Sequence, residues 1–215
     1  MIICFTGQKG GVGKSTLAIA FANYLVQEKG IDVKMYDFDS QQTIYQRWNI
    51  DNEHVPGDKL YEVNYIERDN NIFDVEFFDE HYESDEVIIV DLAGTQDMIY
   101  TDLLQQSNFL ILPFEYTEFS MKSTLVFLYV LGQIESMSEK IFIANRYDKG
   151  YNYPGEEFFN GQIKEHNGTL VNSKILKRNE LQKITTKSLN YAQKKAVKDA
   201  FEEMIILMDI KVPKN

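Results

Sequence analysis

The chain has 215 residues and a mass of 25.0 kDa, the size of one globular domain. Hydrophobic residues make up 44% and charged residues 26%, which excludes a disordered or low-complexity chain. A single cysteine, Cys4, excludes an internal disulfide and a multi-thiolate metal centre within one chain. No apolar run approaches the roughly 18 residues that span a bilayer, and no basic leader precedes MIICFTG, so we expect a cytoplasmic protein.

The net charge of −11 is unevenly distributed along the chain. Residues 1–138 hold 8 Lys/Arg and 23 Asp/Glu, whereas residues 139–215 hold 14 Lys/Arg and 10 Asp/Glu. Residues 172–198 contain eight basic side chains and one acidic side chain, Glu180. A basic segment in an acidic protein predicts either a local nucleic-acid surface or a solvated helix face.

Short apolar runs alternate with helical patterns along most of the chain. In the first helix, predicted over Lys14–Lys29, an apolar face recurs at helical spacing. This face consists of Leu17, Phe21, Tyr24 and Leu25. The predicted strands are residues 2–6, 33–38, 87–91, 109–114 and 140–145. Continuously apolar strands alternating with helices predict a doubly wound α/β fold, a mostly parallel sheet with helices on both faces.

Two further regions complete a single predicted domain over residues 1–215. A last helix is expected over residues 189–208, with its apolar face on Ala192, Ala196, Phe201, Met204 and Ile205. Residues 49–85 are acidic and show no clear periodicity, and within them residues 61–67 form a candidate strand.

The segment QKGGVGKST, Gln8 to Thr16, follows the first strand and opens the first helix. Its glycines, Gly10, Gly11 and Gly13, allow backbone N–H groups to turn around phosphate oxygens. The loop and the N-terminus of the first helix predict a P-loop nucleotide site. Val12 and Thr16 are among its expected nucleotide-binding residues. Lys14 would bridge the β- and γ-phosphates and Ser15 would ligate Mg²⁺. Gln8 stands where the general pattern has glycine.

Lys9 places a second lysine at the start of this loop, and KGGVGKST resembles the deviant Walker A motif of the ParA/MinD family of ATPases. The length resembles that of short ParF-like partition members. In that family the signature lysine contacts the nucleotide of the partner subunit, so the resemblance implies an ATP-bound homodimer. Two apposed triphosphates repel each other unless cations lie between them.

The resemblance extends to three later strand ends. YDFDSQQT resembles the family's D-x-D-P-Q segment, with Ser40 in place of proline, which implies that Asp39 orients the attacking water and Asp37 supports Mg²⁺. EVIIVDLAG resembles a Walker B strand, which implies that Asp91 holds Mg²⁺ and that Gly94 donates its N–H to the γ-phosphate. IFIANRYD implies an adenine contact by Asn145.

The resemblance also implies how the protein acts. ATP and Mg²⁺ would be its cofactors, hydrolysis would be slow, and the dimer would bind non-specific DNA on a bacterial nucleoid. A ParB-like centromere-binding or adaptor protein would be its partner. The expected DNA-binding residues are Lys174, Lys177, Arg178, Lys183 and Lys187.

Two alternatives remain open at this point. A GTPase switch fits because residues 91–94 match D-x-x-G and residues 145–148 read N-R-Y-D, close to the guanine-reading N-K-x-D. A MinD-like positioning ATPase is the other alternative. The tail AFEEMIILMDIKVPKN carries acidic residues beside a core-like apolar stripe, so we expect no stable membrane anchor.

Overall fold

The computed structural model describes residues 1–8, 10–53, 59–67, 71–81, 86–94 and 98–213. Seven strands form one fully parallel sheet in the order β3-β2-β4-β1-β5-β6-β7. Their bounds are β1 Ile2–Phe5, β2 Val33–Phe38, β3 Val63–Tyr65, β4 Val87–Leu92, β5 Phe109–Phe114, β6 Glu139–Ala144 and β7 Gly168–Leu170. The doubly wound α/β prediction is confirmed, and the sheet is all-parallel rather than mostly parallel.

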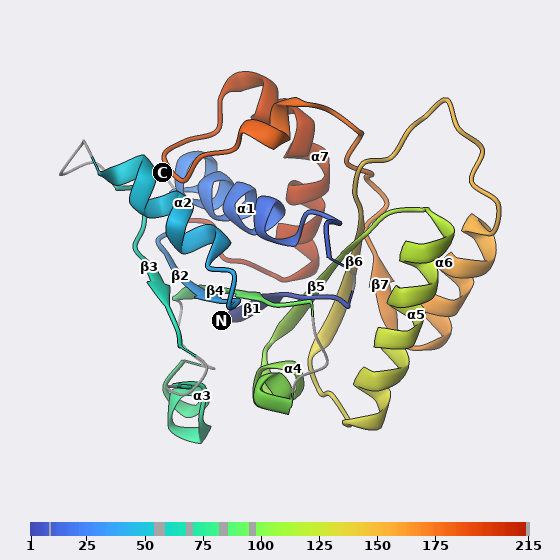
Figure 1. Ribbon diagram of the computed structural model, residues 1–215, viewed down its shortest axis with the longest axis horizontal. Helices are drawn as coiled ribbons and strands as arrows, with labels where there is room; N and C mark the ends of the chain where they lie inside the picture. Colours follow the sequence, from blue (N-terminus) through green and yellow to red (C-terminus); the bar gives the residue numbers. More distant parts are fainter. Residues whose placement is uncertain (9, 54–58, 68–70, 82–85, 95–97, 214–215) are drawn as a thin grey trace.

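Helices cover both faces of the sheet (Figure 1). Helices α1, α2 and α7 lie on one face, and α3, α4, α5 and α6 lie on the other. Their bounds are α1 Lys14–Lys29, α2 Thr43–Asn52, α3 Val75–His81, α4 Thr101–Gln106, α5 Glu118–Gln133, α6 Glu156–Glu165 and α7 Tyr191–Leu207. Two short 3-10 turns are η2 Met98–Tyr100 and η3 Glu180–Lys183.

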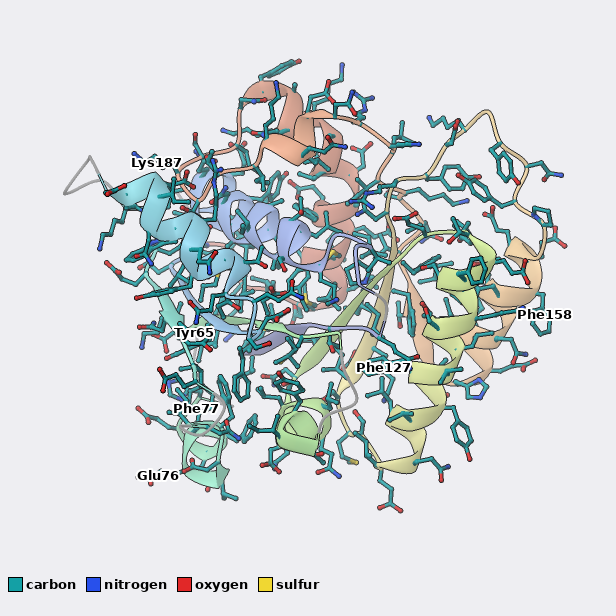
Figure 2. The ribbon with its side chains drawn as sticks, in the orientation of Figure 1. Tyr65, Glu76, Phe77, Phe127, Phe158 and Lys187 are labelled. Carbon is teal, nitrogen blue, oxygen red and sulfur yellow. The ribbon has the colours of Figure 1, made fainter. Side chains whose placement is uncertain are left out.

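The sheet separates two hydrophobic clusters. Phe21 and Phe201 pack edge to face between α1 and α7, with ring centroids 5.1 Å apart. On the opposite face, Phe127 of α5 is buried against the sheet, whereas Phe158 of α6 points outward (Figure 2). The central strands are buried along their whole length, which explains why their sequences are continuously apolar.

The structure corrects two expectations about individual elements. Helix α7 begins at Tyr191, and its buried stripe runs through Val197 and Ala200, whereas Ala192 and Ala196 are only half-buried. The unassigned acidic region contains α3 as well as β3, and β3 is limited to three residues. The short strand β7 was not predicted, because three residues of the sequence GTL carry no strand periodicity.

None of the helices within the described parts of the chain is long and apolar enough to cross a membrane.

The contact between α1 and α7 gives a stability prediction. Phe201→Ala removes a ring with no exposed surface that contacts Phe21 and Tyr24, so we expect a loss of about 3–5 kcal/mol in the free energy of unfolding. Urea denaturation followed by circular dichroism measures this loss. The control is Ile206→Ala, which truncates a 77% exposed side chain on the same helix and should change the free energy by less than about 0.5 kcal/mol.

Candidate nucleotide site

The predicted phosphate loop joins the end of β1 to the start of α1. Gly13 precedes the helix with φ 96°, a left-handed conformation that disfavours residues with a Cβ, and Gly11 has φ 80°. Gly10 is exposed. Because no side chain caps α1 at Gly13, its first N–H groups are available to an anion.

Strand β6 supports this loop from the side. Asn145 Nδ2 donates to the Val12 carbonyl at 2.8 Å, and a Cβ at Gly13 would lie 2.5 Å from the same nitrogen. The Asn145 Oδ1 accepts the Arg146 N–H, so both ends of the amide are engaged. The adenine contact of Asn145 therefore stays a prediction, and the observed contacts give the residue a loop-positioning role.

Arg146 is a second support, and the sequence reasoning missed it. Its guanidinium donates to the Gly11 carbonyl at 2.6 Å and to Glu115 Oε1 at 2.9 Å, which ties the loop to the end of β5. Its position directly after Asn145 is the one signal in the sequence for this role.

Lys14 lies folded into the site, with 8% of its surface exposed. Burial lowers the pKa of its ammonium group, while the nearby charges of Asp91 and Asp39 oppose that shift. Gly94 packs closely here, because a Cβ on it would lie 3.1 Å from Lys14 Nζ and 3.2 Å from the Gln8 carbonyl oxygen. Lys9 lies outside the described residues, and the cross-subunit expectation for it is untested.

Ser15 and Asp91 form the candidate magnesium position. The Ser15 hydroxyl donates to Asp91 Oδ2 at 2.6 Å, while Asp91 Oδ1 is buried and has no hydrogen-bond partner among the described residues. Burial raises the pKa of the Asp91 carboxyl to about 8. A buried, unpartnered carboxylate oxygen beside a serine hydroxyl fits a hard cation. Thr16 lies next to Ser15 and is half-buried.

The described residues contain no group of three or more His, Cys, Asp or Glu side chains that would hold a metal ion alone. Mg²⁺ is usually held by one or two carboxylates together with substrate phosphates and water. When bound, the ion would neutralise charge on the phosphates, with Ser15 and Asp91 as its protein side.

Asp37 and Asp39 lie at the end of β2, beside β4, whose Asp91 pairs in register with Asp37. Asp37 has no exposed surface, and its carboxylate accepts backbone N–H groups from Asp39, Ile44 and Tyr45. Burial raises the pKa of Asp37, and those three N–H groups act against the shift. Asp39 is half-buried and its Oδ1 accepts the Gln41 N–H.

The five expected DNA-binding residues have different surroundings. Lys174 forms an ion pair with Glu156 and lies 4.0 Å above the Tyr147 ring, so its charge is used within the protein. Lys177, Arg178 and Lys183 are exposed. Lys187 is half-buried and lies beside the C-terminal end of α2 (Figure 2).

A groove of about 840 Å³ runs between α7 and residues 172–178. Its lining comes from four segments of the chain and contains six basic residues and two acidic ones, Glu28 and Asp199. The basic residues are Lys149, Lys174, Arg178, Lys194, Lys195 and Lys198. The set chosen from the sequence omitted four of them, although the spacing of Lys194, Lys195 and Lys198 places them on one helix face.

The geometry thus combines a helix N-terminus without a side-chain cap, a buried lysine and a carboxylate oxygen that has no hydrogen-bond partner in the described parts of the chain. The family model for the CobQ/CobB/MinD/ParA nucleotide binding domain matches residues 3–191. The chain belongs to this family. The ParA/MinD resemblance is confirmed, and the chain is a nucleotide-binding protein of the ParA/MinD ATPase type.

Solved structures of ParA/MinD proteins share the fold. A putative plasmid partition protein of Borrelia burgdorferi B31, bound to AMPPNP, is 20% identical with a TM-score of 0.73, and the match covers 96% of this chain and 98% of that chain. MinD in the MinC:MinD complex of Aquifex aeolicus is 14% identical with a TM-score of 0.70, covering 100% and 98%. The pNOB8 ParA bound to nonspecific DNA is 14% identical with a TM-score of 0.63, covering 97% and 96%. Comparison with curated protein sequences gives no significant match.

The support from β6 gives a prediction about nucleotide affinity. Asn145→Ala leaves the Val12 carbonyl without its donor and loosens the loop around Gly13, so we expect nucleotide binding to weaken by about tenfold. Equilibrium titration with a fluorescent ATP analogue measures the change. Asn160→Ala is the matched control, because Asn160 lies on α6, outside the loop, and its Oδ1 accepts the Tyr116 hydroxyl. Equal affinities of the two variants would contradict the positioning role of Asn145.

Proposed function

We propose that the protein is a ParA-like ATPase whose ATP-dependent dimerisation switches non-specific DNA binding, for DNA segregation or cargo positioning. The observation that carries this proposal is the Ser15–Asp91 pair with its unpartnered Asp91 oxygen at the open N-terminus of α1. A triphosphate bound there would meet backbone N–H groups and Lys14, and Mg²⁺ would meet Ser15 and Asp91.

Hydrolysis requires a group that orients water toward the γ-phosphate. Asp39 lies at the end of β2, the strand next to the one that carries Asp91. Its charge is close enough to influence the pKa of Lys14. Asp39 is therefore the proposed water-orienting residue, Lys14 stabilises charge on the phosphates, and the reaction is a slow Mg²⁺-dependent hydrolysis of ATP.

The proposed dimer places two nucleotides face to face, with Lys9 of each subunit neutralising the nucleotide of the other. ADP leaves the subunits monomeric, because the γ-phosphate and its metal ion are missing at the interface. Mutual repulsion of the two triphosphates makes such cations necessary.

The proposed DNA surface consists of basic residues of the groove at α7 that form no ion pair with another described residue, together with Lys177, Lys183 and Lys187 outside the groove. Those in the groove are Lys149, Arg178, Lys195 and Lys198, because Lys174 pairs with Glu156 and Lys194 with Glu28. One such patch on a protein of net charge −11 binds DNA weakly, but a dimer presents two and raises the effective concentration. The pNOB8 ParA bound to nonspecific DNA supports this choice of ligand. A ParB-like adaptor would release the dimer from the nucleoid, and no stable membrane anchor is part of the proposal.

Two other functions have specific observations behind them. The 145–148 segment favours a guanine reader, yet Asp148 is exposed and its carboxylate accepts the Gly150 N–H of its own turn. The likeness to MinD of Aquifex aeolicus favours a positioning ATPase that does not act on DNA. Parallel titrations with ATP and GTP, and DNA binding in the presence of ATP, separate these functions from the proposed one.

The nucleotide site predicts distinct effects of three substitutions. Lys14→Ala should abolish ATP binding, whereas Asp39→Ala should bind ATP normally and reduce turnover at least about a hundredfold. Analytical ultracentrifugation of Asp39→Ala should show dimers with ATP and monomers with ADP. Adding Lys9→Ala to that variant should prevent the dimer, and undiminished dimerisation would remove Lys9 from the interface.

The groove predicts a charge-dependent interaction with DNA. Reversing Lys177 and Arg178 to glutamate should weaken DNA binding by about tenfold or more while preserving ATP binding and dimerisation, because fewer counterions are released. Fluorescence anisotropy at several salt concentrations, with two unrelated duplexes, measures affinity and sequence preference. The control reverses Lys122 and Lys164, which carry the same charge and lie outside both the groove and residues 172–198. Equal effects of both pairs would reduce the segment to a solvated surface.

A further inference from the structure

The residue directly before α2 does not cap the helix with its side chain. Gln42, the residue before the helix, has φ 52° and its side chain makes no capping bond. The first N–H groups of any helix have no partner within the helix, so they need acceptors from elsewhere. Here the acceptor comes from the preceding strand. Asp37 Oδ2 accepts the N–H groups of Ile44 and Tyr45, the second and third residues of α2, at 2.9 Å each.

The same carboxylate also holds the turn that carries Asp39. Asp37 Oδ1 accepts the Asp39 N–H at 3.1 Å. Asp39 in turn accepts the Gln41 N–H at its Oδ1 and the Gln42 N–H at its carbonyl oxygen. Because position 40 is serine, no proline ring restricts the backbone of this turn. The hydrogen bonds to Asp37 and Asp39 hold the turn instead. The orientation of Asp39 therefore depends on a chain of hydrogen bonds that begins at Asp37.

Asp37 and Asp91 differ in the way their oxygens are used, although they are neighbours in register and neither has exposed surface. Asp91 keeps one buried oxygen without a partner among the described residues. Both oxygens of Asp37 already accept hydrogen bonds, and its negative charge lies at the positive end of the α2 dipole. Three hydrogen bonds to the backbone of Asp39 and α2 already use this carboxylate, and a metal ion bound directly to it would compete with them.

We propose that Asp37 is a positioning residue, which caps α2 and orients Asp39, and that Ser15 and Asp91 alone form the protein side of the magnesium site. This replaces the magnesium role that the sequence suggested for Asp37. The inference rests on the proposed ATPase function in so far as it concerns turnover, but the capping itself is independent of any nucleotide.

The first experiment measures hydrogen exchange of single amides by NMR in the nucleotide-free protein. In the wild type, the amides of Ile44 and Tyr45 should exchange at least about fivefold more slowly than unbonded amides, and Asp37→Ala, which removes both acceptor oxygens, should abolish that protection. Asp39→Ala is the matched control, because it makes the same truncation two residues later and should leave both amides protected. If Asp37→Ala does not fold, the wild-type measurement still decides, since unprotected Ile44 and Tyr45 amides overturn the proposal.

The second experiment separates positioning from metal binding. Asp37→Ala should lower kcat at least about tenfold while the Mg²⁺ concentration for half-maximal ATP binding stays within twofold of wild type. Asp91→Ala should instead raise that Mg²⁺ concentration about tenfold or more. A raised Mg²⁺ requirement in Asp37→Ala would overturn the inference. A wild type without ATPase activity would overturn the proposed function and leave the exchange result standing.

Discussion

Two carboxylates without solvent exposure, Asp37 and Asp91, lie side by side at the carboxyl edge of the sheet, and much of the site follows from that placement. Burying an anion costs several kcal/mol unless it is partnered. The partners come from the Ser15 hydroxyl and from the backbone of α2, with the charge of Lys14 nearby. Because each partner stands at the first turn of a helix, the carboxylates tie the starts of α1 and α2 to adjacent strands. Parallel topology makes this possible, since it brings the carboxyl ends of all the strands to one edge.

The sequence predicted the parallel sheet, the phosphate loop and the two strand-end carboxylates, because continuous apolar runs and a glycine-rich turn are local signals. It did not predict the bonds of Asn145 and Arg146 to the loop, which join residues more than 130 positions apart. The sequence also did not predict that Asp37 and Asp91 have different hydrogen-bond partners, since those of Asp37 depend on where the backbone of α2 begins. Element ends and the three-residue strands lacked enough periodicity to be located.

The count of charged residues located a basic segment of the chain, but it did not show which of its lysines are free of ion pairs. Residues 180–190 are anchored by bonds from Asn23 to the Thr185 carbonyl, from Thr186 to Asp51 and from Leu189 to Gln27. This anchoring joins the basic segment to α1 and α2, the same helices that begin at the nucleotide site. Lys174 shows the limit of a charge count, because Glu156 and Tyr147 take up a charge that the sequence assigned to an external ligand.

The two margins of the sheet are formed by β3 and β7, and each has only three residues. An edge strand of three residues exposes few unpaired backbone groups, so a strand from another molecule has little backbone to pair with. Continuation of the sheet from one molecule to the next is therefore disfavoured. Self-association of this fold then depends on complementary side-chain surfaces, which a bound ligand can change, rather than on backbone pairing, which it cannot.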